Sequence, residues 1–162
     1  MKKFCIVLQM IVLSQIVFAQ SKIDFNPLQQ LLKRQVPWLS GKVIFSSIPS
    51  EKGNDVFEIK TAKGKLIVTA SSKPAAGEAI NWYLKYYCNQ LLTHSGSNIA
   101  ALRELPEIKN AEKHVSWAMH RYSLNYCTFN YTMSFWTWEQ WEKELDWMAL
   151  NGVNLALAVV GM

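Results

Sequence analysis

Residues 121–162 read RYSLNYCTFNYTMSFWTWEQWEKELDWMALNGVNLALAVVGM, and this stretch decides the predicted fold. Alternation at 122–128 predicts a strand, residues 137–150 have helical periodicity, and the apolar run at 153–160 predicts a second strand. This order is typical of a parallel βαβ unit with a right-handed crossover. Parallel strands need helices on both faces and further strands beside them, so we expect this unit to open a larger α/β domain.

Capping residues define the ends of the helix within this unit. Thr137 is the predicted N-cap, Gln140 completes a capping box, and Asn151-Gly152 is the predicted C-cap. The helical spacing predicts an inner apolar stripe made of Trp138, Trp141, Leu145 and Met148. The charged side chains are expected mostly on a solvated outer face, namely Glu139, Glu142, Lys143, Glu144 and Asp146.

Polar side chains in the first strand are candidates for a binding site. Alternation places Asn125 and Cys127 on one strand face, and Tyr131 continues that face if the extended geometry persists. A buried, unsatisfied amide costs about 1–3 kcal/mol, so Asn125 needs a partner. In a barrel, polar groups near the end of a strand are typical of a ligand site. A core asparagine bonded to the backbone is the alternative.

Aromatic residues dominate the loop at 129–136 that follows this strand. Exposed rings beside an amide can cover the apolar side of a sugar while the amide binds its hydroxyls. The loop therefore suggests a carbohydrate platform. The alternative is that Phe135 and Trp136 fill the interior of a barrel. Spacing alone does not separate an eightfold barrel from an open doubly wound sheet.

The preceding part of the chain predicts a small α+β layer. The expected elements are a helix at 24–39, a strand at 42–48, a hairpin at 55–59 and 65–70 around Lys63-Gly64, and a long helix from Pro74 to about Thr93. Residues 94–118 resemble a linker with a weak strand at 99–102. We place the boundary near residue 115, which gives an N-terminal domain at 20–115 and the start of a second domain at 116–162.

Residues 1–19 have the features of a secretory signal peptide. A positively charged start precedes an apolar core at 5–17 and a small-residue cleavage site at 17–19. An uncleaved membrane anchor is the alternative, and Gln9 and Gln15 interrupt the apolar core that it would need. The expected location is the periplasm or the outside of the cell.

The charge of the chain gives little indication of a polyanionic partner. Signal cleavage removes Lys2 and Lys3 and lowers the formal charge from +5 to about +3. That charge does not indicate nucleic-acid binding. No apolar run of about 18 residues follows the signal, so we expect no membrane association after cleavage. The sequence does not indicate an oligomeric state.

Cysteine and histidine positions bear on disulfide and metal chemistry. Cys88 and Cys127 could form one disulfide in an oxidising compartment, although two buried thiols are favoured because both fall in predicted regular structure. The histidines lack the spacing of metal ligands; they are His94, His114 and His120. We predict no metal site and no cofactor.

Residues 125–158, NYCTFNYTMSFWTWEQWEKELDWMALNGVNLALA, resemble the signature region of the alpha-N-acetylglucosaminidases, glycoside hydrolase family 89. The similarity is dense over 122–158 and only architectural over 20–115. This resemblance implies a small α+β domain, a (β/α)8 barrel and an all-helical C-terminal domain. The implied fold class is α/β: the small α+β N-terminal domain followed by the first βαβ unit of a truncated (β/α)8 barrel.

The resemblance also implies an activity and a site. The activity is retaining exo-hydrolysis of terminal alpha-linked N-acetylglucosamine from glycans. Asn125 would bond sugar hydroxyls, Cys127 would line the pocket, and Tyr131 would pack on or bond the sugar. Both catalytic carboxylates would come from later barrel strands beyond residue 162, so the isolated chain is expected to be inactive. A non-catalytic glycan-binding module is the alternative, and a periplasmic α/β binding domain would need several more strands.

Overall fold

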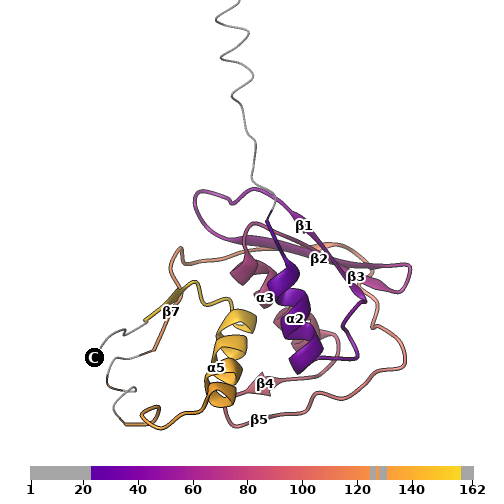
Figure 1. Ribbon diagram of the computed structural model, residues 1–162. Coiled ribbons are helices and arrows are strands. Elements are labelled where there is room, and N and C mark those ends of the chain that lie inside the picture. The colour runs from indigo at the N-terminus through magenta and orange to yellow at the C-terminus, as the bar shows by residue number, and fades with distance from the viewer. Residues whose placement is uncertain (1–22, 125–126, 128–130, 158–162) are drawn as a thin grey trace, which may run out of the picture.

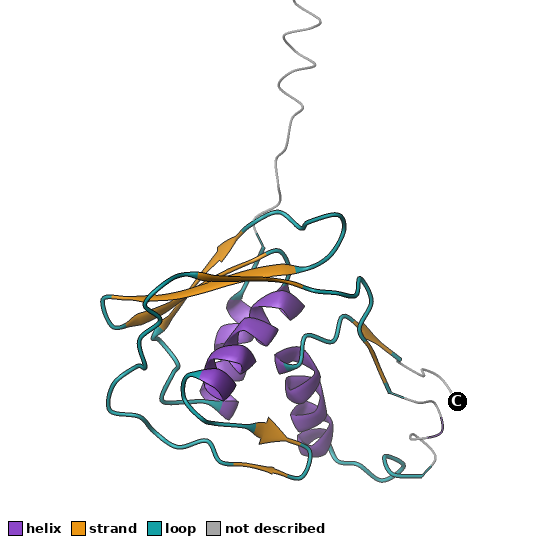
Figure 2. Cartoon of the chain, turned by 180° about the vertical axis from the view of Figure 1, so that it is seen from behind, coloured by secondary structure: helices purple, strands orange, loops and turns teal. Residues whose placement is uncertain are grey.

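The chain adopts a mixed α/β fold in the computed structural model, which describes residues 23–124, 127 and 131–157. A four-stranded sheet carries its helices on one face, and a short parallel strand pair lies to one side (Figures 1 and 2). The mixed α/β class predicted from the sequence is therefore confirmed. The predicted signal peptide lies outside the described residues. No helix in the described part has both the length and the apolarity needed to cross a bilayer.

The main sheet has the strand order β1-β3-β2-β6. Its strands are β1 (Val43–Ser47), β2 (Val56–Ala62), β3 (Lys65–Ala70) and β6 (Glu112–Val115). β1 runs parallel to β3, and the other pairs are antiparallel. The predicted hairpin is confirmed: Lys63 and Gly64 both have positive φ angles, as the tight turn between β2 and β3 requires.

The strand β6 lies in the stretch that the sequence assigned to a linker. The weak strand expected at 99–102 was wrong, because those described residues have no regular structure. β6 instead pairs with β2, with Phe57 opposite His114 and Ile59 opposite Glu112. Its sequence, EKHV, lacks an apolar alternation. Pairing with the open edge of β2 therefore stabilises β6 as a strand, and this pairing depends on the tertiary structure and not on the local sequence.

The helices α2 (Asn26–Gln35) and α3 (Lys73–Tyr86) confirm two predicted helices. Ser72 caps α3 by accepting a hydrogen bond from the Ala75 amide at 3.1 Å. α3 ends before the predicted Thr93 because Asn89 takes a left-handed φ of 53°. The chain then forms a two-residue antiparallel hairpin, made of β4 (Leu92–Thr93) and β5 (Gly96–Ser97).

The core lies between the sheet and the two helices α2 and α3. Ile80, Tyr83 and Leu84 of α3 are fully enclosed, and the core also receives Leu150 from the last helix. The largest fully buried side chains are Tyr83, Leu32, Leu39, Ile59, Leu66, Ile80, Leu84, Leu150, Val36, Val56 and Val68. The N-terminal layer and the last helix therefore share one core.

The predicted βαβ unit is present as β7 (Tyr122–Ser123), α5 (Trp138–Leu150) and β8 (Leu155–Ala156), with β7 parallel to β8. The first strand is shorter than predicted. Leu124 has a φ of 78°, which a bulky residue rarely adopts, and Cys127 is helical. Within the described residues β7 has a single neighbour, so little backbone pairing extends the strand.

The ends of α5 were predicted correctly, whereas its buried face was confirmed only at Met148. The Thr137 amide donates to the Gln140 side chain at 2.9 Å, and Asn151 follows the last turn as the C-cap. However, Trp138 is 65% exposed and Leu145 is also exposed. The buried residues of α5 are Glu144, Asp146, Met148 and Leu150. These residues lie on two sides of α5, because residues 144 and 146 are about 160° apart around a helix. Asp146 faces α2 and pairs with Arg34, whereas Glu144 faces the β4–β5 hairpin and pairs with His94.

Cys88 and Cys127 are thiols; Cys88 is buried and Cys127 half-buried. Burial raises the pKa of Cys88 to about 11. Since only the thiolate reacts, we expect iodoacetamide at pH 8 to modify Cys88 more than about a hundredfold more slowly than a cysteine of ordinary pKa. Intact-mass kinetics on a Cys5→Ser, Cys127→Ser variant would measure this rate. The same variant in urea serves as control, and equal rates with and without urea would contradict the prediction.

Candidate functional site

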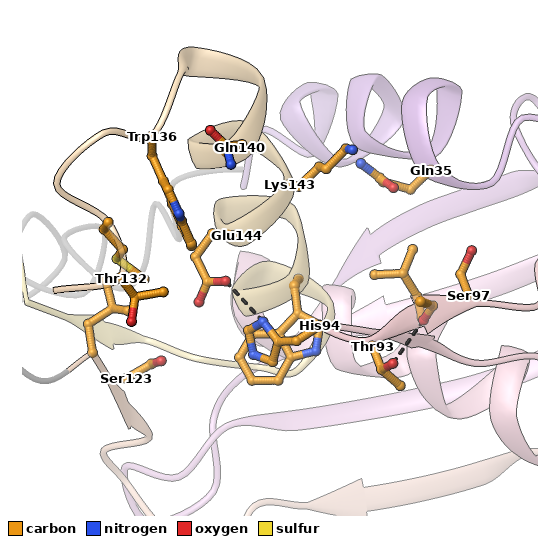
Figure 3. Close-up of a pocket in the computed structure, with 15 residues that line it drawn as sticks. Gln35, Thr93, His94, Ser97, Ser123, Thr132, Trp136, Gln140, Lys143 and Glu144 are labelled. Carbon is orange, nitrogen blue, oxygen red and sulfur yellow. Dashed lines mark hydrogen bonds and ion pairs between the residues drawn. The ribbon is translucent and has the colours of Figure 1, made fainter. Parts of the chain in front are cut away.

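A pocket of about 740 Å³ lies where β7 ends, between α5 and the β4–β5 hairpin (Figure 3). We call it the β7 pocket. Ser123 and Leu124 contribute from the end of β7, and Gln35 reaches it from α2. The other lining residues come from the hairpin, the aromatic loop and α5: Leu92, Thr93, His94, Gly96, Ser97, Thr132, Met133, Trp136, Gln140, Lys143, Glu144 and Trp147.

A carboxylate–imidazole pair joins two walls of the β7 pocket. Glu144 Oε2 lies 3.1 Å from His94 Nδ1, and Figure 3 shows the carboxylate pointing at the ring. Glu144 is only 5% exposed, whereas more than half of the His94 side chain is accessible. The imidazole also packs against Trp147, with ring centroids 3.8 Å apart. These contacts hold the hairpin against α5.

The hairpin itself is closed by a local hydrogen bond. Thr93 Oγ1 donates to the Gly96 carbonyl at 2.8 Å, which fixes the turn that carries His94. Gly96 has a φ of 146°, a backbone geometry that favours glycine. The position of His94 therefore depends on the short turn between β4 and β5.

Two indole rings line the β7 pocket, Trp136 from the aromatic loop and Trp147 from α5. Trp136 packs edge-on against Trp141 at 5.3 Å between ring centroids, and Met133 beside it is buried. The neighbouring Phe135 is almost fully exposed, so it fills no interior in the described structure. Ring faces beside the polar ends of Gln140 and Lys143 form a surface of the kind that binds sugars.

The described residues of the predicted sugar site are not brought together in the β7 pocket. Asn125 lies outside the described residues, Cys127 is half-buried, and Tyr131 is 82% exposed. Neither Cys127 nor Tyr131 lines the β7 pocket. The shared strand face that was to unite the three residues is wrong at Cys127, because this residue is helical and not extended. Their roles in binding sugar stay a prediction.

Sequence reasoning missed the pair of His94 and Glu144. His94 was assigned to a linker and Glu144 to a solvated helix face, and the two are far apart in the chain. No local pattern connects them, because their contact depends on how the β4–β5 hairpin docks on α5. In the described part of the chain, no group of three His, Cys, Asp or Glu side chains could hold a metal ion.

Comparison with known proteins gives two family matches in chain order. Residues 26–107 match the alpha-N-acetylglucosaminidase N-terminal domain, and residues 121–162 match the alpha-N-acetylglucosaminidase TIM-barrel domain. The human alpha-N-acetylglucosaminidase is 39% identical over 94 residues, which cover 58% of this chain and 13% of the human protein.

Solved structures agree with these matches. A family 89 glycoside hydrolase from Clostridium perfringens, in complex with 2-acetamido-1,2-dideoxynojirmycin, superposes with a TM-score of 0.79 at 37% identity. A form of that enzyme with two glutamate-to-glutamine substitutions, in complex with its substrate GlcNAc-alpha-1,4-galactose, matches equally well. Each match covers 83% of this chain and 16% of the other.

These relatives are glycoside hydrolases, and this chain resembles their N-terminal part in sequence and in fold. The chain belongs to the alpha-N-acetylglucosaminidase family. It spans less than a fifth of the length of the relatives reported above.

Proposed function

We propose that this chain is the N-terminal part of a secreted glycoside hydrolase that releases terminal alpha-linked N-acetylglucosamine from glycans. The observation that carries the proposal is the pair of family matches in chain order, over a fold that superposes on a family 89 hydrolase with a TM-score of 0.79. That hydrolase has been solved with a substrate ending in alpha-linked GlcNAc. A similar terminal sugar is the proposed substrate here.

In this proposal β7, α5 and β8 form the first βαβ unit of a (β/α)8 barrel. Residues 20–115 form the preceding α+β domain, and residues 116–162 begin the barrel. The parallel pairing of β7 with β8 supports this arrangement. The exposed apolar side of α5, with Trp138 and Leu145, supports it as well, because a barrel helix buries such a stripe against the strands.

The catalytic carboxylates are proposed to lie outside residues 1–162. A retaining glycosidase needs two carboxyl groups about 5–5.5 Å apart, one nucleophile and one acid/base. The two buried carboxylates of α5 are engaged in other contacts, since Glu144 pairs with His94 and Asp146 pairs with Arg34. They hold the N-terminal layer against α5, which is a structural role.

Sugar binding is proposed for Asn125, Cys127 and Tyr131. The support is their position in the segment after β7, because barrel enzymes build their sites at the C-terminal ends of strands. The β7 pocket opens at the same strand end. The proposed location, the periplasm or the cell exterior, follows from the signal-peptide features of residues 1–19.

A chimeric enzyme tests the proposed activity. Residues 23–157 would replace the matching segment of the Clostridium perfringens family 89 hydrolase. We expect this chimera to hydrolyse 4-nitrophenyl alpha-N-acetylglucosaminide, whereas the 162-residue chain alone gives no turnover. Release of nitrophenol measures both. In the chimera, Asn125→Ala should lower kcat/KM at least about tenfold, because a sugar hydroxyl loses its partner.

The matched control is Asn110→Ala, at an exposed position away from both pockets, which should leave kcat/KM unchanged. Turnover by the isolated chain would show that its own carboxylates suffice and would contradict their proposed location. An inactive but folded chimera, together with sugar binding by the isolated chain, would favour a non-catalytic glycan-binding module.

A further inference from the structure

A second pocket of about 340 Å³ lies between α3, the β2–β6 edge and the turn after α5. We call it the Glu78 pocket, after the carboxylate in its wall. It shares no lining residue with the β7 pocket. The lining residues are Asp55, Phe57, Ala75, Glu78, Trp82, His114, Val115, Ser116, Trp117, Arg121 and Asn151.

Aromatic rings form much of the wall of the Glu78 pocket. The His114 ring stacks on Phe57 at 4.9 Å and lies 4.2 Å from Trp82, measured between centroids. Trp117 adds a further indole and is 95% exposed. Such a large exposed ring at the rim of a pocket has no packing role in the described structure, and it leaves a π-face open to a ligand.

Three of the donor side chains that line the Glu78 pocket are engaged within the protein, those of Arg121, Ser116 and Asn151. Arg121 donates through Nε to the Gly152 carbonyl at 2.5 Å, through Nη1 to Ser116 and Ala118, and through Nη2 to Asp55. The Ser116 hydroxyl donates to the Ala118 carbonyl. Asn151 donates through Nδ2 to the Trp147 carbonyl at 2.9 Å. These groups offer few donors to a ligand.

The charges of Asp55 and Arg121 offset each other. Burial alone would raise the pKa of Asp55, but hydrogen bonds from Ser72 and Arg121 hold it below its ordinary value. Asp55 therefore stays ionised at neutral pH and neutralises the guanidinium beside it. Arg121 also acts electrostatically on Glu78, so the lining of the pocket holds two carboxylates, Asp55 and Glu78, against one guanidinium.

Glu78 has no hydrogen bond or ion pair within the described part of the chain. Its side chain lies against the turn after α5, since a Cβ added at Gly152 would come within 3.2 Å of Glu78 Oε2. Burial raises its pKa, and the charges of Arg121 and Lys85 offset this only in part. Lys85 does not line the pocket; it stands 5.1 Å from the centre of the Tyr86 ring.

From this geometry we infer that the Glu78 pocket binds an organic ammonium cation, with its positive head between the aromatic rings and the Glu78 carboxylate. A cation over the face of an indole is attracted by the ring quadrupole, and a carboxylate within the same pocket adds charge pairing. The engaged donors favour a cation over a neutral sugar, because sugar hydroxyls need donors as well as acceptors. Sugar binding here is one outcome of the test.

Calorimetric titration of the 162-residue chain with choline, ethanolamine, N-acetylglucosamine and 3,3-dimethylbutan-1-ol tests the inference. The last compound is the uncharged analogue of choline. We expect choline to bind at one site with a Kd on the order of millimolar, and the uncharged analogue at least about tenfold more weakly. Comparing choline with ethanolamine shows whether the pocket prefers a quaternary or a primary ammonium.

Variants locate the binding. Glu78→Gln keeps the shape and removes the charge, and it should weaken choline binding about tenfold. Trp117→Ala should weaken it as well, and this exposed residue can be changed without disturbing the core. The matched controls are Glu104→Gln and Trp138→Ala, an exposed carboxylate and an exposed indole outside the pocket, and they should have no effect.

Circular dichroism confirms that each variant is folded, and Glu78→Asp should restore part of the affinity lost in Glu78→Gln. Equal binding of choline and its uncharged analogue would overturn the inference. So would unchanged binding in both Glu78→Gln and Trp117→Ala. Binding of N-acetylglucosamine that Trp117→Ala abolishes, in the absence of choline binding, would make the pocket a sugar site. None of these outcomes affects the activity expected of the chimera, so the hydrolase proposal is tested independently of this inference.

Discussion

Gly77→Ala is expected to lower the free energy of unfolding by about 3 kcal/mol, because the added methyl group would overlap the backbone of α5. Gly77 lies in α3 where α5 crosses it. A Cβ at this position would lie 2.8 Å from the carbonyl carbon of Ala149 and closer still to its oxygen. The obstacle is backbone, which cannot rotate away, so α5 must shift from α3 and disturb the core at Leu150. Urea denaturation followed by circular dichroism measures the loss.

Whether Gly77→Ala lowers or raises the stability tests the packing of α5 on α3. In a helix without such a contact, alanine is more favourable than glycine by about 0.5–1 kcal/mol. Ala149→Gly should not rescue the variant, because the contact is with backbone and not with the Ala149 side chain. Lys85→Ala, on the exposed side of α3, is the control and should change stability by less than about 0.5 kcal/mol. A stabilising Gly77→Ala would mean that α5 does not pack on α3 as described.

Asp146→Ala is expected to cost about 2 kcal/mol of stability, because it removes a charge-assisted network across two helices. Arg34 donates to Asp146 from Nε at 3.0 Å and from Nη2 at 2.6 Å, and Gln35 donates at 3.0 Å. Asp146 is buried, but the Arg34 side chain is 37% exposed. Arg34 can therefore be solvated when Asp146 is removed, which limits the loss of stability. The same denaturation assay measures it.

Glu142 offers a matched control for Asp146. It lies on the same helix and contacts the same arginine, but at 3.4 Å and with a more exposed side chain. Glu142→Ala should therefore cost less than about 0.5 kcal/mol. Arg34→Lys should lower the free energy of unfolding by most of the amount lost in Asp146→Ala, because a lysine cannot make the two parallel hydrogen bonds. Equal effects of Asp146→Ala and Glu142→Ala would contradict the assigned role of Asp146.

Signals carried by a few adjacent residues were predicted well. Lys63-Gly64 indicated the hairpin because a tight turn needs positive φ at both positions. Thr137 with Gln140 indicated the start of α5, and Asn151-Gly152 indicated its end, because capping depends only on neighbouring backbone groups. The parallel order of β7 and β8 followed from the helix between them and the handedness of such crossovers.

Predictions failed where a residue depends on a distant partner. β6 was missed because EKHV forms a strand only against the edge of β2. The candidate site was affected in the same way. Glu144 was predicted to face solvent, but the hairpin that carries His94 covers it in the structure. The predicted face uniting Asn125, Cys127 and Tyr131 assumed a long strand, and β7 ends at Ser123.

The sequence by itself determined the helices α2 and α3, the β2–β3 hairpin, the βαβ order of the last elements and the caps of α5, because these rest on periodicity and on contacts between near neighbours. The family followed from the resemblance of residues 122–158 to its signature region. Only the tertiary structure decided which face of α5 is buried. Periodicity identifies an apolar stripe, but a buried carboxylate is tolerated wherever another element provides a cation or a donor. For Asp146 and Glu144 those partners, Arg34 and His94, lie 50 or more residues away in the chain.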